Sequence, residues 1–149
     1  MGTGEKGPAD ALRWERIAQP AEELVQALRQ GLTAYNMEHG RIQATRPLGI
    51  FVWDGDGALA AGIYGEIWGS CLDIKYLWVH TAWRGRGIGS RLLREMEEEG
   101  RRQGCVWAYL NTFSFQAPDF YRRHGYEPIF TMEGYPEGIT RIFLRKRLT

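Results

Sequence analysis

The feature that most constrains the fold is a run of alternating glycines in the middle of the chain, at residues 84–89 (RGRGIG). An apolar segment, residues 72–79, precedes this run, and an amphipathic helical pattern, residues 87–103, follows it. Glycine adopts left-handed backbone conformations at little cost and leaves neighbouring amides uncovered by side chains. We therefore predict a buried strand that turns tightly into the N-terminus of a helix.

The predicted turn has the chemistry of an anion-binding site. The first N–H groups of a helix lack intrahelical partners and carry a partial positive charge, so they can bind phosphate oxygens. Arg84 and Arg86 can add charge-assisted hydrogen bonds. The alternative is a glycine-rich surface connection with solvated arginines, but the position directly between strand and helix favours anion binding.

The spacing of the glycines argues against two common phosphate-binding loops. It is G-x-G-x-G, whereas dinucleotide-binding folds carry G-x-G-x-x-G and open the chain with this unit. The motif G-x-x-x-x-G-K-[ST] of nucleoside triphosphatases does not occur in the sequence. A dinucleotide-binding domain is therefore disfavoured as an alternative.

The remaining patterns predict one α+β (mixed α/β) domain with a single sheet, over residues 11–149, after a flexible N-terminus at residues 1–10. The apolar spacing of Leu24, Leu28, Leu32 and Tyr35 predicts a helix between Pro20 and Gly40. We expect a hairpin of residues 48–53 and 58–68, further strands at 11–17, 105–112, 126–132 and 141–148, and a short helix at 118–123.

Charge spacing within the long helix predicts two outward ion pairs. Glu97 precedes Arg101 by four residues, and Glu98 precedes Arg102 by four. This order of charges is favourable on an exposed helix face.

Composition and charge exclude several protein classes. The 149 residues, 44% of them hydrophobic, suffice for one folded domain, and the net charge of +1 gives no basic excess for nucleic acid. The basic residues 141–147 fit a solvated edge strand. No apolar window is long enough to span a membrane, and residues 1–10 do not resemble a signal peptide. Cys71 and Cys105 have no metal-ligand spacing, so we expect free thiols, no metal and a cytoplasmic location.

These motifs resemble those of the GCN5-related N-acetyltransferases (GNAT). Residues 84–89 are similar to the family motif [Q/R]-x-x-G-x-[G/A], and Leu77-Trp78-Val79 to the strand before it. The later pattern A-x-x-[hydrophobic]-Y-x-x-x-G-[F/Y] is matched by Ala117, Phe120, Tyr121, Gly125 and Tyr126. Residues 111–118 (NTFSFQAP) and 31–36 (GLTAYN) resemble a bacterial subgroup, so the resemblance covers most of the chain.

The resemblance implies a GNAT-like domain whose mostly antiparallel sheet is flanked by helices and splays between two parallel strands, residues 72–79 and 105–112. It also implies transfer of an acetyl group from acetyl-CoA, without a metal, to a primary amine of a small molecule, peptide or protein in a ternary complex. The pantetheine arm would pair with the backbone of Leu77 and Val79, and the pyrophosphate would bind the amides of residues 84–90. The implied cofactor-binding residues are Leu77, Trp78, Val79, Arg84, Gly85, Arg86, Gly87, Ile88, Gly89, Ser90, Asn111 and Ser114, although many relatives carry Asn where Ser114 stands.

Acetyl transfer to an amine needs a base for the ammonium and an acid for the departing thiolate. Asp73 lies six residues before Val79, where relatives often carry a glutamate base, and strand periodicity would place it on one face with Lys75, Leu77 and Val79. A carboxylate that only pairs with Lys75 is the alternative for Asp73.

Two further residues complete the implied catalytic set. Glu66, on the neighbouring strand, is a second candidate base, and relatives often reach a distant carboxylate through water. Tyr121 occupies the acid position of the family, and a phenol stays protonated at neutral pH. A core aromatic is the alternative for Tyr121.

Two histidines and five aromatic residues could also belong to the site, but structural roles are the simpler interpretation. His80 and His124 have no carboxylate at a fixed spacing, so both are expected to be structural or exposed. Five aromatic residues could wall an acceptor pocket or belong to the core: Trp68, Trp78, Trp107, Phe113 and Phe115. A noncatalytic acyl-CoA sensor is the alternative function. Family members often pair through their C-terminal strands, and the pattern of residues 139–148 permits a homodimer.

Overall fold

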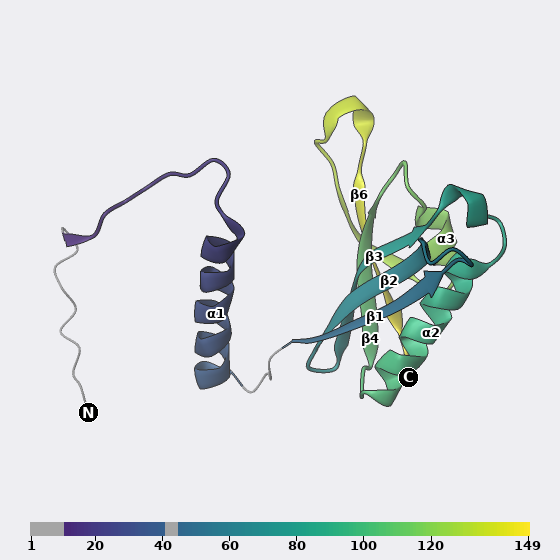
Figure 1. Ribbon diagram of the computed structural model, residues 1–149, viewed down its shortest axis with the longest axis horizontal. Helices are drawn as coiled ribbons and strands as arrows, with labels where there is room; N and C mark the ends of the chain where they lie inside the picture. The colour runs from purple at the N-terminus through teal and green to yellow at the C-terminus, as the bar shows by residue number, and fades with distance from the viewer. Residues whose placement is uncertain (1–10, 41–44) are drawn as a thin grey trace.

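A computed structural model describes residues 11–40 and 45–149. Its centre is a six-stranded sheet of order β1-β2-β3-β4-β6-β5 (Figure 1). Within the described residues, β3 and β4 are parallel and every other neighbouring pair is antiparallel, which confirms the predicted mixed, mostly antiparallel sheet. The strands are β1 (Arg46–Trp53), β2 (Leu59–Trp68), β3 (Cys71–Val79), β4 (Trp107–Phe113), β5 (Glu127–Met132) and β6 (Arg141–Arg147).

Three α-helices accompany the sheet in the described part of the chain: α1 (Glu22–His39), α2 (Ile88–Arg102) and α3 (Pro118–Arg123). Short 3-10 segments occur at Thr81–Trp83 and Pro136–Gly138. Helices α2 and α3 lie on one side of the sheet, whereas α1 stands apart on the other side (Figure 1). The helices predicted around residues 20–40, 87–103 and 118–123 are therefore confirmed.

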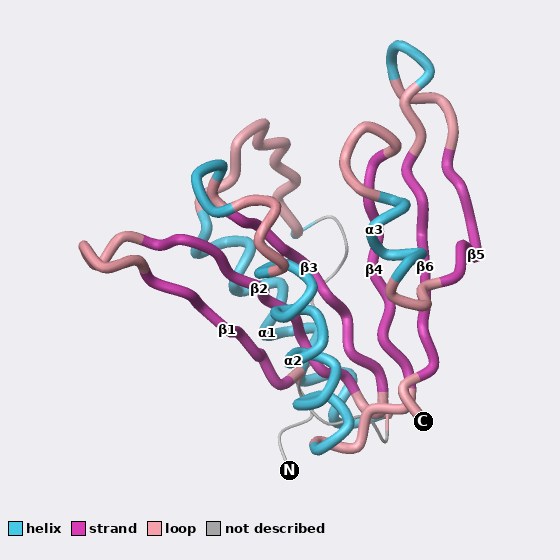
Figure 2. Tube along the Cα trace, turned by 90° about the vertical axis from the view of Figure 1, so that its right-hand side faces the viewer, coloured by secondary structure: helices cyan, strands magenta, loops and turns pink. Residues whose placement is uncertain are grey.

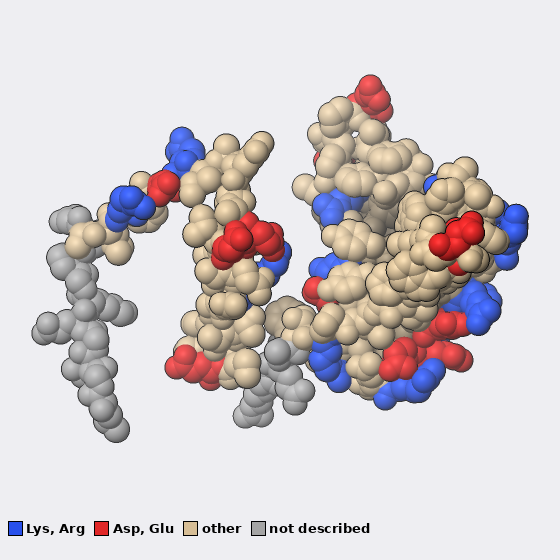
Figure 3. Space-filling model, viewed as in Figure 1, with Lys and Arg blue, Asp and Glu red and all other residues tan. Residues whose placement is uncertain are grey.

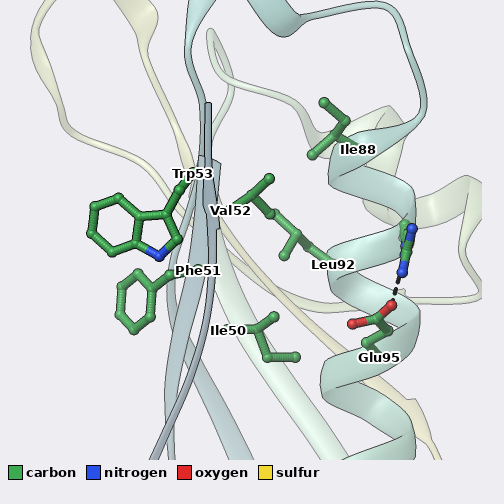
Figure 4. Close-up of a pocket in the computed structure, with 8 residues that line it drawn as sticks. Ile50, Phe51, Val52, Trp53, Ile88, Leu92 and Glu95 are labelled. Atoms are coloured by element: carbon green, nitrogen blue, oxygen red, sulfur yellow. Dashed lines mark hydrogen bonds and ion pairs between the residues drawn. The ribbon is translucent and has the colours of Figure 1, made fainter. Parts of the chain in front are cut away.

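The hydrophobic core lies between α2 and the sheet. Helix α2 buries Leu92, Leu93 and Met96 against alternate residues of the strands, such as Ile63 of β2 and Leu72 of β3. Burying one such side chain contributes about 1.5–3 kcal/mol. On β1, Ile50 and Val52 point toward α2, while Phe51 and Trp53 point to the opposite face (Figure 4).

The two parallel strands separate after a short contact. Their register pairs Cys71 with Trp107, Leu72 with Ala108 and Asp73 with Tyr109. No further pair of β3 and β4 follows in the described chain, and the two strands diverge toward the end at which α3 lies (Figure 2). The predicted splay is therefore confirmed, and it begins directly after Asp73.

A register shift in β3 overturns one expectation about side-chain direction. On β2, Gly65 pairs with Ile74 and Tyr64 pairs with Tyr76, so Lys75 is an extra residue on β3. Such a bulge reverses the alternation of side chains along the strand. Leu77 and Val79 therefore pack against the core, and Asp73 does not share their face.

Two predictions about strands at the edges of the sheet are wrong. Residues 11–17 are described and exposed but form no strand, because they lie away from any strand that could supply hydrogen bonds. Strand β6 is not an edge, since it lies between β4 and β5. Its basic side chains stack on aromatic rings instead, with Arg145 4.5 Å from the centre of Trp107. The flexible terminus predicted at residues 1–10 lies outside the described residues.

The expected outward pair of Glu97 and Arg101 is also wrong. Glu97 is only 2% exposed, and its carboxylate accepts hydrogen bonds from Lys146 Nζ at 2.8 Å and from the Tyr126 hydroxyl at 3.1 Å. Arg101 donates to the Leu148 carbonyl at 2.7 Å. The stripe of α2 that faces the sheet is wide enough to include Glu97, and β6 supplies the compensating cation.

Cys105 is buried, Cys71 is half-buried and both are free thiols, as the sequence predicts. None of the helices within residues 11–40 and 45–149 has the length and apolar character needed to cross a bilayer.

Candidate active site

The glycine turn connects β3 to α2 with its backbone open to the surroundings. Gly85 and Gly87 have φ angles of 73° and 78°, in the left-handed region that disfavours other residues. A Cβ atom at either position would meet no atom within 4 Å among the described residues. The first helical hydrogen bond runs from the Arg91 N–H to the Gly87 carbonyl at 3.0 Å, and the Arg84 N–H donates to the Thr81 carbonyl at 3.4 Å. The amides of residues 85–90, between these two, are the ones placed to bind an anion. This geometry fits a phosphate group.

The two arginines of the turn are held by neighbouring groups. Arg84 Nε donates to the Val79 carbonyl at 2.9 Å, and the Arg86 guanidinium lies 4.9 Å from the centre of the Trp83 ring. His80 caps the 3-10 segment, because its Nδ1 accepts from the Ala82 N–H at 3.0 Å. His80 is therefore structural, as expected.

His124 joins α3 to the start of α2. Its Nε2 lies 2.9 Å from Ser90 Oγ, and burial lowers the pKa of His124, which favours the neutral imidazole at neutral pH. A Cβ on Gly89 would lie 3.7 Å from Phe120 and 3.7 Å from Val79, so α3 sits close to the glycine turn. Residues 90 and 124 are far apart in the sequence, and no local signal could have linked them.

The backbone of β3 is open on the side of the splay. The His80 N–H pairs with the Ala60 carbonyl of β2, whereas the Val79 carbonyl points the other way, to Arg84. Leu77 lies two residues earlier and faces the same side. The backbone groups of Leu77 and Val79 therefore face the splay, where Arg84 occupies the Val79 carbonyl.

Tyr121 lies on the helical side of the sheet. It packs against the hydrophobic core, with ring centres 5.1 Å from Phe120 and 6.0 Å from Tyr126. Burial raises the pKa of Tyr121, so its hydroxyl stays protonated at neutral pH. The contacts that hold the ring fit a core aromatic, and they are also compatible with proton donation by the hydroxyl.

The two candidate bases lie side by side on the opposite face. Glu66 of β2 and Asp73 of β3 are direct partners in the register. Lys75 Nζ lies 2.6 Å from Asp73, and this hydrogen bond raises the pKa of Lys75. Glu66 accepts a hydrogen bond from the Tyr64 hydroxyl at 3.1 Å. Asp73 thus has a charged partner, whereas the hydrogen-bond partner of Glu66 is a neutral hydroxyl.

A cavity of about 490 Å³ opens at the splay beside Asp73. Tyr109 lies in its wall, where burial and the Asp73 carboxylate raise the pKa of Tyr109. Neither Tyr109 nor Arg141 could be selected from the sequence, because only the pairing of β3, β4 and β6 brings them to Asp73. The lining residues are Asp73, Ile74, Lys75, Tyr76, Tyr109, Asn111, Phe113, Gln116 and Arg141.

Two expected cofactor-binding residues make contacts at the far end of β4. Asn111 Oδ1 accepts a hydrogen bond from Arg141 Nε at 2.7 Å, and Ser114 Oγ accepts one from the Thr140 N–H at 3.1 Å. Of the aromatic residues, Phe113 lines the cavity, while Trp68, Trp78 and Phe115 are exposed rather than part of the core. In the described residues no cluster of three or more His, Cys, Asp or Glu side chains could hold a metal ion.

The sequence of the chain is similar to those of known acetyltransferases. The acetyltransferase (GNAT) domain profile matches residues 47–128, more than half of the chain. An acetyltransferase of Agrobacterium fabrum is 33% identical over 125 residues, which are 84% of this chain and 91% of the relative. Blasticidin-S acetyltransferase of Streptomyces morookaense is 41% identical over 93 residues, which are 62% of this chain and 68% of the relative.

Two solved structures agree with this result. An acetyltransferase from Bacillus cereus is 31% identical, with TM-score 0.74 and coverage of 89% of this chain and 97% of that one. An Agrobacterium tumefaciens protein assigned as an acetyltransferase is 30% identical, with TM-score 0.85 and coverage of 91% and 99%. The chain is an acetyltransferase and belongs to the GNAT family.

Proposed function

We propose that the protein transfers an acetyl group from acetyl-CoA to a primary amine of a small molecule in a ternary complex. The observation that carries this proposal is the separation of β3 and β4 directly after Asp73. The glycine turn lies at the far end of β3, and the cavity that Asp73 lines lies beside the point of separation. A donor and an amine could therefore meet in the splay from two different sides.

The residues of the chain would divide the binding of acetyl-CoA among them. Amides of residues 84–90, supported by Arg84 and Arg86, would hold the pyrophosphate. The backbone of Leu77 and Val79, on either side of Trp78, would pair with the pantetheine arm. Asn111 and Ser114 would contact the cofactor from β4 and the turn after it. Bound acetyl-CoA supplies the activated acyl group.

Proton transfer would use groups on both faces of the sheet. Asp73 or Glu66, directly or through water, would take the proton of the acceptor ammonium, and Tyr121 would donate a proton to the thiolate. Both carboxylates lie on the side of the cavity, whereas Tyr121 packs on the side of α2 and α3. The sheet thus separates the proposed base from the proposed acid.

The cavity favours a small acceptor. Its volume of about 490 Å³ lies in the range of small-molecule sites, and it combines aromatic side chains with both signs of charge. The similarity to blasticidin-S acetyltransferase supports the same substrate class. We place the reaction in the cytoplasm, where acetyl-CoA and free thiols are stable.

A screen of amines with acetyl-CoA, followed by release of free thiol and mass spectrometry of the acceptor, tests the proposal. We expect acetylation of at least one small amine at a rate well above hydrolysis. A protein that binds acetyl-CoA but acetylates no amine, small or peptide, would instead support the acyl-CoA sensor.

A further inference from the structure

Helix α1 carries an apolar stripe that the described residues of the chain leave uncovered. Leu24, Leu28, Leu32 and Tyr35 recur on one face and are 52% to 76% exposed, and α1 has no buried residue. Gly31 lies on the same face, and a Cβ there would meet no described atom within 4 Å. Most of the stability of an amphipathic helix in a protein comes from packing of its apolar face, and an interior glycine weakens the helix by about 1 kcal/mol. The helix therefore needs a surface to pack against.

The sheet has an uncovered aromatic face that matches this stripe. On the side opposite α2, β1 to β3 present large side chains that are 45% to 72% exposed: Phe51, Trp53, Trp68, Tyr76 and Trp78. Phe51 and Trp53 point away from α2 (Figure 4). The register of β2 and β3 places the carboxylates of Glu66 and Asp73 between Trp68 and Tyr76 on this face. Several large exposed apolar side chains on one face mark an interaction surface.

The helix does not cover this face of its own chain. Helix α1 stands on the side of the sheet opposite α2 (Figure 1), which is the side to which Phe51 and Trp53 point (Figure 4). A gap separates the helix from the rest of the molecule along most of its length (Figure 3). The end of α1 comes close to the sheet at a shallow depression formed by Tyr35, Asn36, His39, Gly40 and Trp68. Apart from this depression, the apolar stripe of α1 and the aromatic face of the sheet both stay exposed within one chain.

We propose that the protein is a two-fold dimer in which the chains exchange α1, so that the stripe of each helix packs on the aromatic face of the other sheet. A two-fold exchange buries both uncovered surfaces twice with the same set of contacts. The occupant is a second copy of this chain because the unpaired stripe and the unpaired face occur together in one sequence.

The similarity to the Agrobacterium tumefaciens structure supports the projecting position of α1. That match covers 91% of this chain at TM-score 0.85. Residues 45–149 alone make up much less than 91% of the 149-residue chain. The matched part must therefore include residues of α1.

The exchange would also complete the acceptor site, a step that rests on the proposed function. Glu66 and Asp73 lie on the same uncovered face as Tyr76 and Trp68, as the pairing of β2 with β3 shows. A helix on this face would roof the cavity, and its polar residues would come from the other subunit. The acceptor would then bind between two chains.

Light scattering of the full chain after size exclusion tests the dimer. We expect twice the chain mass of 17.1 kDa for the wild type and a monomer for the double variant Leu28→Glu/Leu32→Glu. The double variant Gln26→Glu/Gln30→Glu adds the same charge on the opposite side of α1 and should remain dimeric. A monomeric wild type, or a dimer that survives the leucine changes, overturns the proposal.

A crosslink shows which sheet the helix covers. A chain with Leu28→Cys, Tyr76→Cys and Cys71→Ser is treated with a short bis-maleimide and run on a denaturing gel. Exchange predicts covalent dimers, whereas a single-chain band, crosslinked internally or not at all, overturns it. Calorimetric acetyl-CoA affinity of the same proteins keeps the two proposals apart, because loss of the dimer should leave the glycine turn intact. Failure of every form to bind acetyl-CoA would defeat the proposed function and leave the dimer result unaffected.

Discussion

Tyr121 and the carboxylates of Asp73 and Glu66 lie on opposite faces of one sheet, with the splay of β3 and β4 between them. Alternation along β3 makes this possible, because the face of Asp73 is not the face of the core. The bulge at Lys75 then turns Leu77 and Val79 toward the core while their backbone stays open to the splay. A single extra residue thus places the side chain of Asp73 on one face of β3 and those of Leu77 and Val79 on the other.

Replacing Tyr121 tests the role of its hydroxyl. Tyr121→Phe keeps the ring and its packing, so we expect an unchanged melting temperature and acetyl-CoA affinity. The turnover number should fall by about 10²–10⁴, the usual contribution of a general acid. Since burial raises the pKa of Tyr121, loss of its proton should limit the wild type only above the ordinary range of tyrosine.

Tyr126→Phe is the matched control, because Tyr126 is a neighbouring buried tyrosine that bonds Glu97. It should lower stability and leave the turnover of folded protein unchanged. If Tyr121→Phe behaves in the same way, Tyr121 is a core aromatic and not the acid.

The candidate bases can be separated by isosteric changes. Asp73→Asn and Glu66→Gln keep the size of each side chain and remove its basicity. At neutral pH, one of them should reduce turnover strongly, and the loss should shrink as the pH rises and free amine accumulates. Glu127→Gln, at an exposed ion pair of β5, is the control and should have a wild-type pH profile. Wild-type profiles for both test variants would show that neither carboxylate takes the proton.

At the scale of the elements, the contact of α2 with β6 depends on a buried ion pair. Lys146→Ala would leave the Glu97 carboxylate buried without its cation, which typically costs about 3–5 kcal/mol. Chemical denaturation should show this loss. Glu97→Leu/Lys146→Met removes both charges and should be less destabilising than Lys146→Ala. Arg102→Met breaks only the exposed pair with Glu99 and should change stability little. Equal effects of Lys146→Ala and Arg102→Met would contradict the account of the core.

Elements with strong local signals were predicted well from the sequence. The hairpin of β1 and β2, the glycine turn and the proline-led helix α3 each follow from neighbouring residues, and the structure has all three. The strand expected at residues 11–17 and the edge position of β6 were wrong, because a strand depends on partners that are distant in the chain. The outward position of Glu97 was wrong for the same reason, since Lys146 lies on another element.

At the scale of the whole molecule, the candidate site combines predicted and unpredicted parts. The glycine turn proposed to bind phosphate, Tyr121 and Asp73 were selected from motifs. The proximity of Tyr109 and Arg141 to Asp73, and of His124 to Ser90, depends on the strand order and on the docking of α3. The projection of α1 could not be foreseen either, because its periodicity shows an apolar face but not the surface that the face contacts.

We propose that acetyl-CoA binds at the turn between β3 and α2. Calorimetric titration of glycine variants with acetyl-CoA tests this binding most directly. Gly87→Glu places a side chain and a negative charge in the proposed anion site. Gly57→Glu is the matched control, because Gly57 has a φ of 80°, close to the 78° of Gly87, and equally open surroundings in the β1–β2 turn. We predict similar stability for the two folded variants, wild-type affinity for Gly57→Glu and no measurable binding for Gly87→Glu. Wild-type acetyl-CoA affinity in folded Gly87→Glu protein would contradict the account.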